Sequence, residues 1–345
     1  MSSAIPSSMK AWHFSQATGG LEKNLKLNNA ASLPPKANSL GADEILVKVL
    51  STTLNPIDFK IAELPLLGRL AIGTPCSPGL DFAGSVAATG ANSKNLQIGQ
   101  LVFGRLDMPT KFGTLAEYTI APSKGCVPLP EGLSPDDGAC IGTAGITAYQ
   151  SLVPYVKAGD RVFINGGSGG TGVLAIQIAK ILGCYVVTSC SSRNNALCRS
   201  LGADEVILYD KQDVLAELEK IQKFDHVVDN VGTPAGMYWE SHKISNEGAV
   251  YLLVGATPSL GMIYDVMCRF LWPGFLGGGK RKFSLMSAVS DPESLKKMAD
   301  WIVEGKIKIV VDEVFEMEDK GPVRAFEKLK TGHAKGKIVV RVAAS

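Results

Sequence analysis

The sequence has almost no excess of charge of either sign. Its 35 lysines and arginines are balanced by 33 aspartates and glutamates, which leaves a net charge of +2. This balance argues against nucleic acid as a partner, because nucleic-acid-binding proteins carry a strongly basic face. No apolar run reaches the ~20 residues that span a bilayer, and the opening MSSAIPSSMKAW lacks the apolar core of a secretion signal. We therefore expect a cytoplasmic protein.

Clustered cysteines and histidines are also missing. The seven cysteines include no C-x-x-C pair, and a chain of this size needs no disulfides to hold its core, so we expect reduced thiols. The histidines are isolated from one another, and we expect structural or exposed roles for all four, which are His13, His226, His242 and His333. The sequence therefore does not predict catalysis by a histidine.

What the sequence does contain indicates two domains of different character. Its 345 residues, 46% apolar and 20% charged, give room for roughly two cores. The first part is rich in turn residues and in short β-branched runs such as EILVKVLSTTL, which are typical of compact all-β structure. From Gly159 onward, short apolar runs alternate with helix-like segments, which predicts a doubly wound α/β domain with a parallel sheet.

The pattern changes again near Asp291. The remaining segment predicts a helix at 291–306, a strand at 309–317, a helix at 320–332 and a strand at 336–342. It has no glycine-rich phosphate motif of its own, so we expect it to complete the first domain. The predicted organisation is a β-rich substrate domain made of residues 1–143 and 289–345, with a nucleotide-binding domain inserted at residues 144–288.

The stretch FINGGSGGTGVLAIQIAKILG, residues 163–183, places a glycine-rich loop between a predicted strand and a predicted helix. Glycines in a G-x-G-x-x-G pattern allow a tight turn, a close approach of a pyrophosphate, and close packing of helix on strand, while the helix N-terminus offers free N–H groups. We predict dinucleotide binding by six residues, which are Gly167, Ser168, Gly169, Gly170, Thr171 and Gly172. The alternative is a flexible surface turn.

The residues after the second predicted strand favour NADPH. NAD-binding domains place an acidic residue about 20 residues beyond the glycine loop to bind the ribose 2′-hydroxyl, but no acid lies between Asp160 and Asp204. Ser191, Ser192 and Arg193 occupy the expected position, and hydroxyl and guanidinium groups bind a 2′-phosphate well. The alternative is a solvated loop whose arginine faces water.

With these residues in place, the chain resembles the zinc-independent branch of the medium-chain dehydrogenase/reductase superfamily, and most closely its quinone oxidoreductase and 2-alkenal reductase group, which includes the plant chloroplast-envelope homologue. The resemblance covers nearly the whole chain. It rests on ordered matches to LNPIDFKI, PGLDFAGSVAATG, GITAYQSL, the glycine loop, CSSRN, VVDNVG and GHAKGKIVV. It implies a GroES-like domain built from both chain ends with a Rossmann domain inserted, and an active site between them.

The resemblance also implies roles for individual residues. Asn55 and Thr147 would border the nicotinamide ribose, and Tyr209 would join the serine and arginine residues around the adenine-ribose phosphate. The nicotinamide side would be formed by Asn230, Val231, Gly232, Val254, Gly255 and Ala256. Lys337 would also approach the cofactor.

Zinc alcohol dehydrogenases hold their metal with a cysteine in an early loop and with the histidine and glutamate of a GHE triplet. Here the loop reads LNPIDFK, and the triplet is GLD at residues 79–81. The four-cysteine lobe that binds a structural zinc is missing as well. Because imidazole and thiolate ligands are not grouped at tetrahedral spacing, we predict no bound metal.

Without a Lewis acid, hydride transfer to an electrophilic acceptor is easier than oxidation of a plain alcohol. We therefore predict reduction, by NADPH, of the activated C=C of a small hydrophobic enone or enal, or of a quinone. The candidate catalytic residues are Lys60 and Asn55, with Asp58 able to hold Lys60. An ordinary structural pair of Asp58 and Lys60 is the alternative, and Tyr149 is a further candidate proton donor that would more simply pack inside a helix.

The segment YDVMCRFLWPGFLGGGKRKF, residues 264–283, combines aromatic and aliphatic residues with the basic cluster Lys280, Arg281 and Lys282. It could form a wall or lid for a bulky apolar substrate. Two other interpretations are an interface between copies of the chain and a peripheral contact with an anionic membrane.

Two alternative functions are also compatible with the sequence. One is a trans-acting enoyl reductase of a polyketide pathway, which requires a surface that docks a carrier protein. The other is a non-catalytic NADPH-binding protein of the same fold. The sequence is compatible with a monomer or a homodimer.

Overall fold

The computed structural model describes residues 5–343 apart from 65–71, 94, 235 and 256–259. The chain forms two compact units. Unit 1 consists of residues 1–146, 289–305 and 311–345, and unit 2 consists of residues 147–288 and 306–310. Unit 1 is thus built from both ends of the chain, and the division near residue 146 falls inside helix α3 (Pro135–Leu152).

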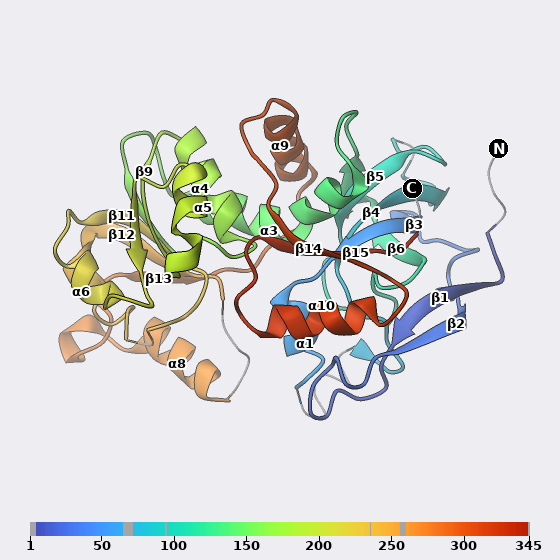
Figure 1. Cartoon of the computed structure of the whole chain (residues 1–345), viewed down its shortest axis with the longest axis horizontal. Coiled ribbons are helices and arrows are strands. Elements are labelled where there is room, and N and C mark those ends of the chain that lie inside the picture. The colour runs from blue at the N-terminus through green and yellow to red at the C-terminus, as the bar shows by residue number, and fades with distance from the viewer. Residues whose placement is uncertain (1–4, 65–71, 94, 235, 256–259, 344–345) are drawn as a thin grey trace. The chain divides into compact units, whose positions relative to one another are not determined.

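Unit 1 is centred on a seven-stranded sheet with the order β14-β15-β3-β4-β5-β7, to which β6 is added by pairing with β3. Neighbouring strands run antiparallel except for β14 and β15. The strands are β3 (Glu44–Thr53), β4 (Asp81–Thr89), β5 (Leu101–Arg105), β6 (Tyr118–Pro122), β7 (Cys126–Pro128), β14 (Val311–Glu316) and β15 (Lys337–Arg341). Figure 1 shows the C-terminal strand β15, in red, beside the early strand β3, in blue.

Smaller elements complete unit 1. They are the antiparallel pair β1 (Ser8–His13) and β2 (Lys26–Ser32), the helices α1 (Pro56–Lys60), α9 (Pro292–Val303) and α10 (Gly321–Lys330), and the 3-10 turn η1 (Ser123–Gly125). Helix α9 begins where expected, because the Asp291 side chain accepts from the backbone N–H groups of Glu293 and Ser294, and Pro292 suits the first helical turn. The helices and strands predicted for the C-terminal segment are confirmed.

Unit 2 contains a six-stranded sheet with the order β10-β9-β8-β11-β12-β13, and every neighbouring pair is parallel. The strands are β8 (Arg161–Asn165), β9 (Tyr185–Cys190), β10 (Glu205–Leu208), β11 (Phe224–Asp229), β12 (Ser245–Leu253) and β13 (Lys282–Leu285). Counted from β8, this order is 3-2-1-4-5-6, the Rossmann order that binds dinucleotides where the strand order reverses. The predicted doubly wound sheet is confirmed.

The helices of unit 2 connect these strands. They are α4 (Gly172–Ile181), α5 (Asn195–Ser200), α6 (Val214–Leu218), α7 (Ser241–Ile244) and α8 (Leu260–Leu271), with 3-10 turns η2 (Ser192–Asn194) and η3 (Gly274–Leu276). The strands are apolar on both faces, as the buried run Val162, Phe163 and Ile164 of β8 illustrates. Within the described ranges, no helix is both long and apolar enough to cross a membrane.

Candidate cofactor and active site

The glycine loop of unit 2 connects β8 to α4 at the carboxyl end of the sheet. The Gly167 N–H donates to the Ser189 carbonyl at 2.9 Å, and the Gly166 N–H donates to the Ser189 hydroxyl at the same distance. A Cβ atom on Gly172 would lie 2.2 Å from the Gly166 carbonyl oxygen, and one on Gly167 would lie 2.0 Å from the Thr188 hydroxyl oxygen. These two positions therefore require glycine for the loop itself.

Gly169 differs from these two glycines. The nearest atom to a Cβ placed there is the Gly166 carbonyl oxygen at 3.6 Å, an ordinary contact. The protein's own packing thus does not demand glycine at position 169, and the missing side chain leaves a cradle at the N-terminus of α4, where free N–H groups bind phosphate. The loop fits the pyrophosphate of a dinucleotide.

A buried polar network fixes the chain segments around this loop. The Asn165 side-chain amide donates to the Asp229 carboxylate at 2.8 Å and to the Thr233 carbonyl at 2.7 Å. The same carboxylate accepts from the backbone N–H groups of Val231 and Gly232 at 3.1 and 2.8 Å. Asn165 and Asp229 therefore position the glycine loop and the predicted nicotinamide segment together. Sequence reasoning did not identify either residue as a support, although both end buried strands.

Two buried polar atoms near these strand ends have no hydrogen-bond partner among the described residues: the Ser191 Oγ and the Asn230 Oδ1. A buried polar atom without a partner costs free energy, and such atoms in native structures commonly meet a ligand or water. Both residues belong to the set predicted to contact the cofactor. Their unused hydrogen-bonding atoms fit a bound ribose or carboxamide group.

The region expected to bind the 2′-phosphate contains an acid that sequence reasoning missed. The Asp210 carboxylate, just beyond β10, accepts from the backbone N–H of Ser192 at 2.8 Å and from its hydroxyl at 2.6 Å. The hydrogen bond from the Ser192 hydroxyl lowers the pKa of Asp210. The segment before Asp204 is free of acids, but β10 lies beside β9 in the sheet and brings Asp210 to Ser192. The Ser192 donors are therefore already used.

The other predicted cofactor residues of unit 2 differ in exposure. Arg193 and Tyr209 are exposed, whereas Thr147 is buried in α3. The N–H groups of Val254 and Gly255 both point to the Asp229 carbonyl, at 2.8 and 3.4 Å. Ala256 lies outside the described residues, and Asn55, Lys60 and Lys337 belong to unit 1.

In unit 1, the Asp81 carboxylate collects five donors although it is fully buried. Its Oδ1 accepts from the backbone N–H and the hydroxyl of Thr143 at 2.7 and 2.6 Å. Its Oδ2 accepts from the Thr53 hydroxyl at 3.0 Å, from the Asn55 amide at 2.8 Å and from the Lys337 ammonium at 3.4 Å. The carboxylate thus joins strands β3, β4 and β15 to helix α3.

Lys337 also donates to the Asn55 Oδ1 at 2.6 Å and to the Leu54 carbonyl at 3.3 Å. An ammonium group has three N–H donors, and these contacts together with Asp81 account for all three. Lys337 therefore positions the Asn55 side chain. This pairing follows from the register of β15 beside β3, in which Val339 faces Thr53.

Asp58 supports the same segment from the first turn of α1. One of its carboxyl oxygens accepts from the Asn55 backbone N–H at 2.7 Å, as an acidic residue at this helix position commonly does. Lys60, the predicted catalytic lysine, is half-buried, and this burial lowers its pKa.

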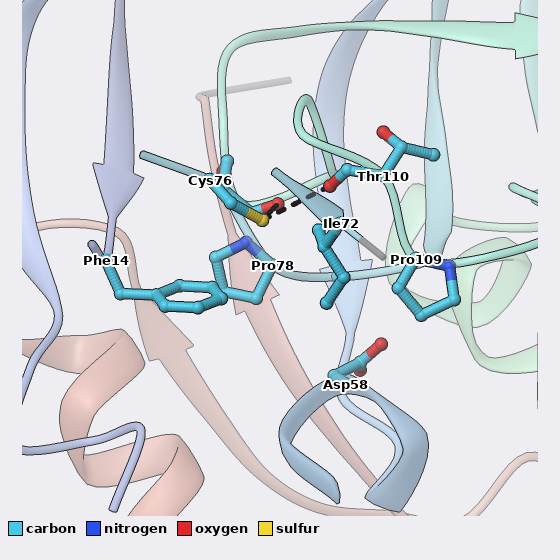
Figure 2. Close-up of a pocket in the computed structure, with 9 residues that line it drawn as sticks. Phe14, Asp58, Ile72, Cys76, Pro78, Pro109 and Thr110 are labelled. Atoms are coloured by element: carbon cyan, nitrogen blue, oxygen red, sulfur yellow. Dashed lines mark hydrogen bonds between the residues drawn. The ribbon is translucent and has the colours of Figure 1, made fainter. Parts of the chain in front are cut away.

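The second Asp58 oxygen, Oδ1, is buried and has no hydrogen-bond partner in the described part of the chain. Figure 2 shows the carboxyl group at a hollow whose lining residues include Ile72, Cys76, Pro78 and Pro109. The cavity volume is about 10 Å³, roughly the room of one water molecule. Burial raises the pKa of Asp58 from its ordinary 3.8 to about 8. A neutral carboxyl group facing this hollow is therefore expected at pH 7.

This raised pKa predicts that the protein loses stability as the pH rises. Between about pH 4 and pH 8 the folded protein holds a proton on Asp58 that the unfolded chain has released, so the free energy of unfolding falls by ~1.4 kcal/mol per pH unit from this group. Asp58→Asn removes the effect. In urea unfolding at pH 5 and pH 8, the free energy of unfolding of the variant should rise relative to that of the parent protein as the pH rises. A difference between the two proteins that is the same at both pH values would contradict the raised pKa.

The described residues do not fit a zinc site. They contain no group of three or more histidine, cysteine, aspartate or glutamate side chains arranged to hold a metal ion. The Asp81 carboxylate is used by five donors, and burial raises the pKa of the Cys76 thiol to about 12, which disfavours the thiolate that zinc binds. All seven cysteines are free.

Comparison with known proteins identifies the family. The model described as "Alcohol dehydrogenase GroES-like domain" matches residues 41–131, and the model described as "Zinc-binding dehydrogenase" matches residues 201–340. With the parallel sheet of unit 2, these matches confirm the predicted class of a GroES-like domain with a Rossmann domain. The chain is an oxidoreductase and belongs to the medium-chain dehydrogenase/reductase family.

The chain is similar to several enoyl, alkenal and quinone reductases over nearly its whole length. The chain is 56% identical over 352 residues to the trans-enoyl reductase pgmF of Aspergillus terreus, covering 99% of this chain and 98% of the relative. It is 33% identical to the NADPH-dependent alkenal/one oxidoreductase of Arabidopsis thaliana, covering 98% of this chain and 80% of the relative. Among solved structures, the quinone oxidoreductase of Coxiella burnetii matches with a TM-score of 0.83 and 32% identity, covering 97% of this chain and 100% of that chain.

Proposed function

We propose that the chain is a trans-acting enoyl reductase, which uses NADPH to reduce the C=C bond of an α,β-unsaturated thioester or ketone. The observation that carries the cofactor part is the glycine loop, in which position 169 leaves a cradle that the protein's own packing does not require. The substrate part is supported by the relative that is 56% identical over nearly the full length of both chains. The trans-acting enoyl reductase was the alternative raised by the sequence, and the alkenal or quinone reductase was the leading prediction.

NADPH, when bound, supplies a hydride to the β-carbon of the substrate, and a proton adds to the α-carbon, so that one enone, one NADPH and one proton give the saturated product and NADP⁺. The glycine loop would hold the pyrophosphate at the N-terminus of α4. The Asn165 and Asp229 network would keep the segment after β11 in place. The free Asn230 Oδ1 would accept a hydrogen bond from the bound cofactor.

In unit 1, the side chain of Asn55 is held at both ends. Its Oδ1 accepts from Lys337, and its amide donates to Asp81. A side chain fixed in this way is suited to accepting a hydrogen bond from a ribose hydroxyl on the second lone pair of its Oδ1, without reorganisation. We also propose that the reaction proceeds without zinc, in keeping with the donor set, and that the protein works in the cytoplasm with free thiols.

The test is loss of NADPH absorbance at 340 nm with a panel of acceptors. The panel contains the crotonyl thioester of N-acetylcysteamine, 2-alkenals and 9,10-phenanthrenequinone, each assayed with and without 1,10-phenanthroline. Reduction of the thioester supports the proposal. Turnover of the alkenals or the quinone alone would favour the second candidate, which the alkenal-reducing relative supports. Clear NADPH binding with no turnover would favour a non-catalytic role, and loss of activity in phenanthroline would contradict the zinc-free reaction.

If the protein prefers NADPH, two substitutions near Ser192 should change its affinity for NADPH in opposite directions. Arg193→Ala removes the exposed guanidinium expected to pair with the 2′-phosphate, and we expect NADPH affinity to fall about tenfold with little change for NADH. Asp210→Asn removes a carboxylate that would repel this phosphate, so NADPH affinity should rise. Fluorescence titration with both cofactors measures the two effects. Weaker NADH binding in the Asp210 variant, with NADPH binding unchanged, would show instead that Asp210 binds a ribose hydroxyl.

A further inference from the structure

Helix α8 of unit 2 packs against its sheet through a polar side chain. Arg269 is buried, pairs with Asp265 at 2.7 Å, and lies over the rings of Tyr238 and Phe283 at 5.4 Å. Val266 packs on the same hydrophobic core. The helix is therefore attached to the unit by the side that carries its charged residues.

The rest of α8 is apolar and largely exposed, although the Phe270 ring also packs on the Phe283 ring with the ring centres 4.9 Å apart. This helix and the turn after it carry eight exposed apolar residues, which together we call the α8 face. They are Ile263, Tyr264, Met267, Phe270, Leu271, Trp272, Phe275 and Leu276. The helical members recur at intervals of three and four residues, so they share one side of the helix. In Figure 1, α8 is drawn in orange at the edge of unit 2.

The turn η3 holds its apolar side chains in the solvent. Phe275 is 86% exposed and Leu276 is 63% exposed. The Trp272 indole N–H donates to the Leu276 carbonyl at 2.9 Å, and the Trp272 ring meets the Trp239 ring with their centres 6.4 Å apart. The turn is thus held in one shape by its own contacts. Monomeric proteins rarely expose so many neighbouring large apolar side chains unless the surface binds something.

The charges beside the α8 face are mostly positive. Asp265 is the only acid between residues 260 and 285, and it is paired with Arg269. Arg281 donates to the carbonyl oxygens of His242 and Ser245, whereas Lys280 and Lys282 are exposed. Glu240 lies near Lys280, but it pairs with Lys243 at 3.0 Å. The rim therefore carries two exposed lysines, and both of these acids are paired with other cations, which complements an anionic partner.

We propose that the α8 face docks the carrier protein that presents the enoyl thioester, an inference that rests on the proposed function. A carrier protein holds its acyl chain on a phosphopantetheine arm, whose phosphate is anionic and complements the two lysines. The α8 face has the composition of a protein interface core, with aromatic residues and methionine in the centre and lysine only at the rim. Two exposed lysines are fewer than the four to eight of lipid-binding basic clusters.

The experiment compares one enoyl group on two supports: the small N-acetylcysteamine thioester, and the same group on an excised acyl carrier protein domain of a reducing polyketide synthase. The variant Phe275→Ser/Leu276→Ser is expected to weaken binding of the carrier protein about tenfold or more, and to lower kcat/KM for the carrier-bound enoyl group by the same factor. Its kcat/KM for the small thioester is expected to stay within about twofold of the parent protein. The variant Lys280→Glu/Lys282→Glu should also weaken carrier binding and reduce its dependence on salt. The matched control, Ile98→Ser/Val303→Ser, removes two apolar side chains that are each 54% exposed elsewhere.

The outcomes separate this inference from the proposed function. Turnover of the small thioester together with carrier binding that ignores the α8 substitutions would overturn the inference and leave the function standing. Carrier binding that depends on the α8 face without any turnover would support the docking surface and count against the function. Two further outcomes, each with carrier binding unchanged in the α8 variants, would overturn the proposal. If only the α8 variants lose binding to vesicles of phosphatidylcholine and phosphatidylserine (70:30), the face binds lipid. If only the α8 variants lose a dimer seen in sedimentation, the face binds a second copy of the chain.

Discussion

Replacing Asp81 by asparagine is expected to lower the melting temperature of the protein by on the order of 10 °C. The buried carboxylate accepts hydrogen bonds from Thr143, Thr53 and Asn55 and lies 3.4 Å from the Lys337 ammonium. An amide cannot accept all of these donors and leaves a buried lysine charge without its carboxylate, a change that costs about 3–5 kcal/mol. For a unit of this size, that free energy corresponds to a shift of this order.

Two further variants test the cause of this loss. The double variant Asp81→Asn/Lys337→Met removes the uncompensated charge and should recover part of the melting temperature. The control Glu318→Gln breaks the exposed pair with Lys10, and an exposed pair contributes little to stability because water and salt screen it. An Asp81 variant that melts within about 2 °C of the parent protein would contradict the structural role assigned to this carboxylate.

Replacing Gly172 by alanine is expected to reduce NADPH affinity by about a hundredfold, which corresponds to ~2.8 kcal/mol. The new Cβ would lie 2.2 Å from the Gly166 carbonyl oxygen and 2.7 Å from the Gly167 Cα. Both are backbone atoms, so the turn between β8 and α4 must change shape. The N–H groups proposed to bind the pyrophosphate would then be displaced. Fluorescence titration with NADPH measures this change.

The matched variant Gly169→Ala distinguishes the shape of the loop from contact with the cofactor. A Cβ at this position has its nearest neighbour at 3.6 Å, so the melting temperature without cofactor should not change. NADPH affinity should still fall, by about tenfold, because the methyl group would occupy the space of the pyrophosphate. Unchanged affinity in both variants would show that the cofactor phosphates lie elsewhere.

Asp210 shows what a local sequence pattern leaves out. No acid lies between Asp160 and Asp204, and this absence favoured NADPH. The parallel pairing of β9 and β10 nevertheless places the Asp210 carboxylate on Ser192. A local search for an acid after the second strand cannot find a residue that a neighbouring strand supplies.

Asp58 gives a similar lesson in unit 1. Its spacing from Lys60 suggested a pair within one short segment, but its carboxyl group binds the Asn55 backbone and faces a hollow lined by Cys76 and Pro109. The raised pKa of Asp58 comes mainly from burial, which depends on residues that lie far apart in the sequence. Sequence spacing identified the residue without its environment.

The sequence by itself determined the parallel sheet of unit 2, the glycine loop and the C-terminal elements of unit 1. These features follow from local rules, because apolar periodicity, glycine spacing and helix-capping residues act over only a few positions. Only the tertiary structure decided that Asp81 joins Asn55 to Lys337, that Asp210 occupies the Ser192 donors, and that α8 turns its apolar side outward. Each of these depends on strand register or on the packing of distant segments, which no local pattern records.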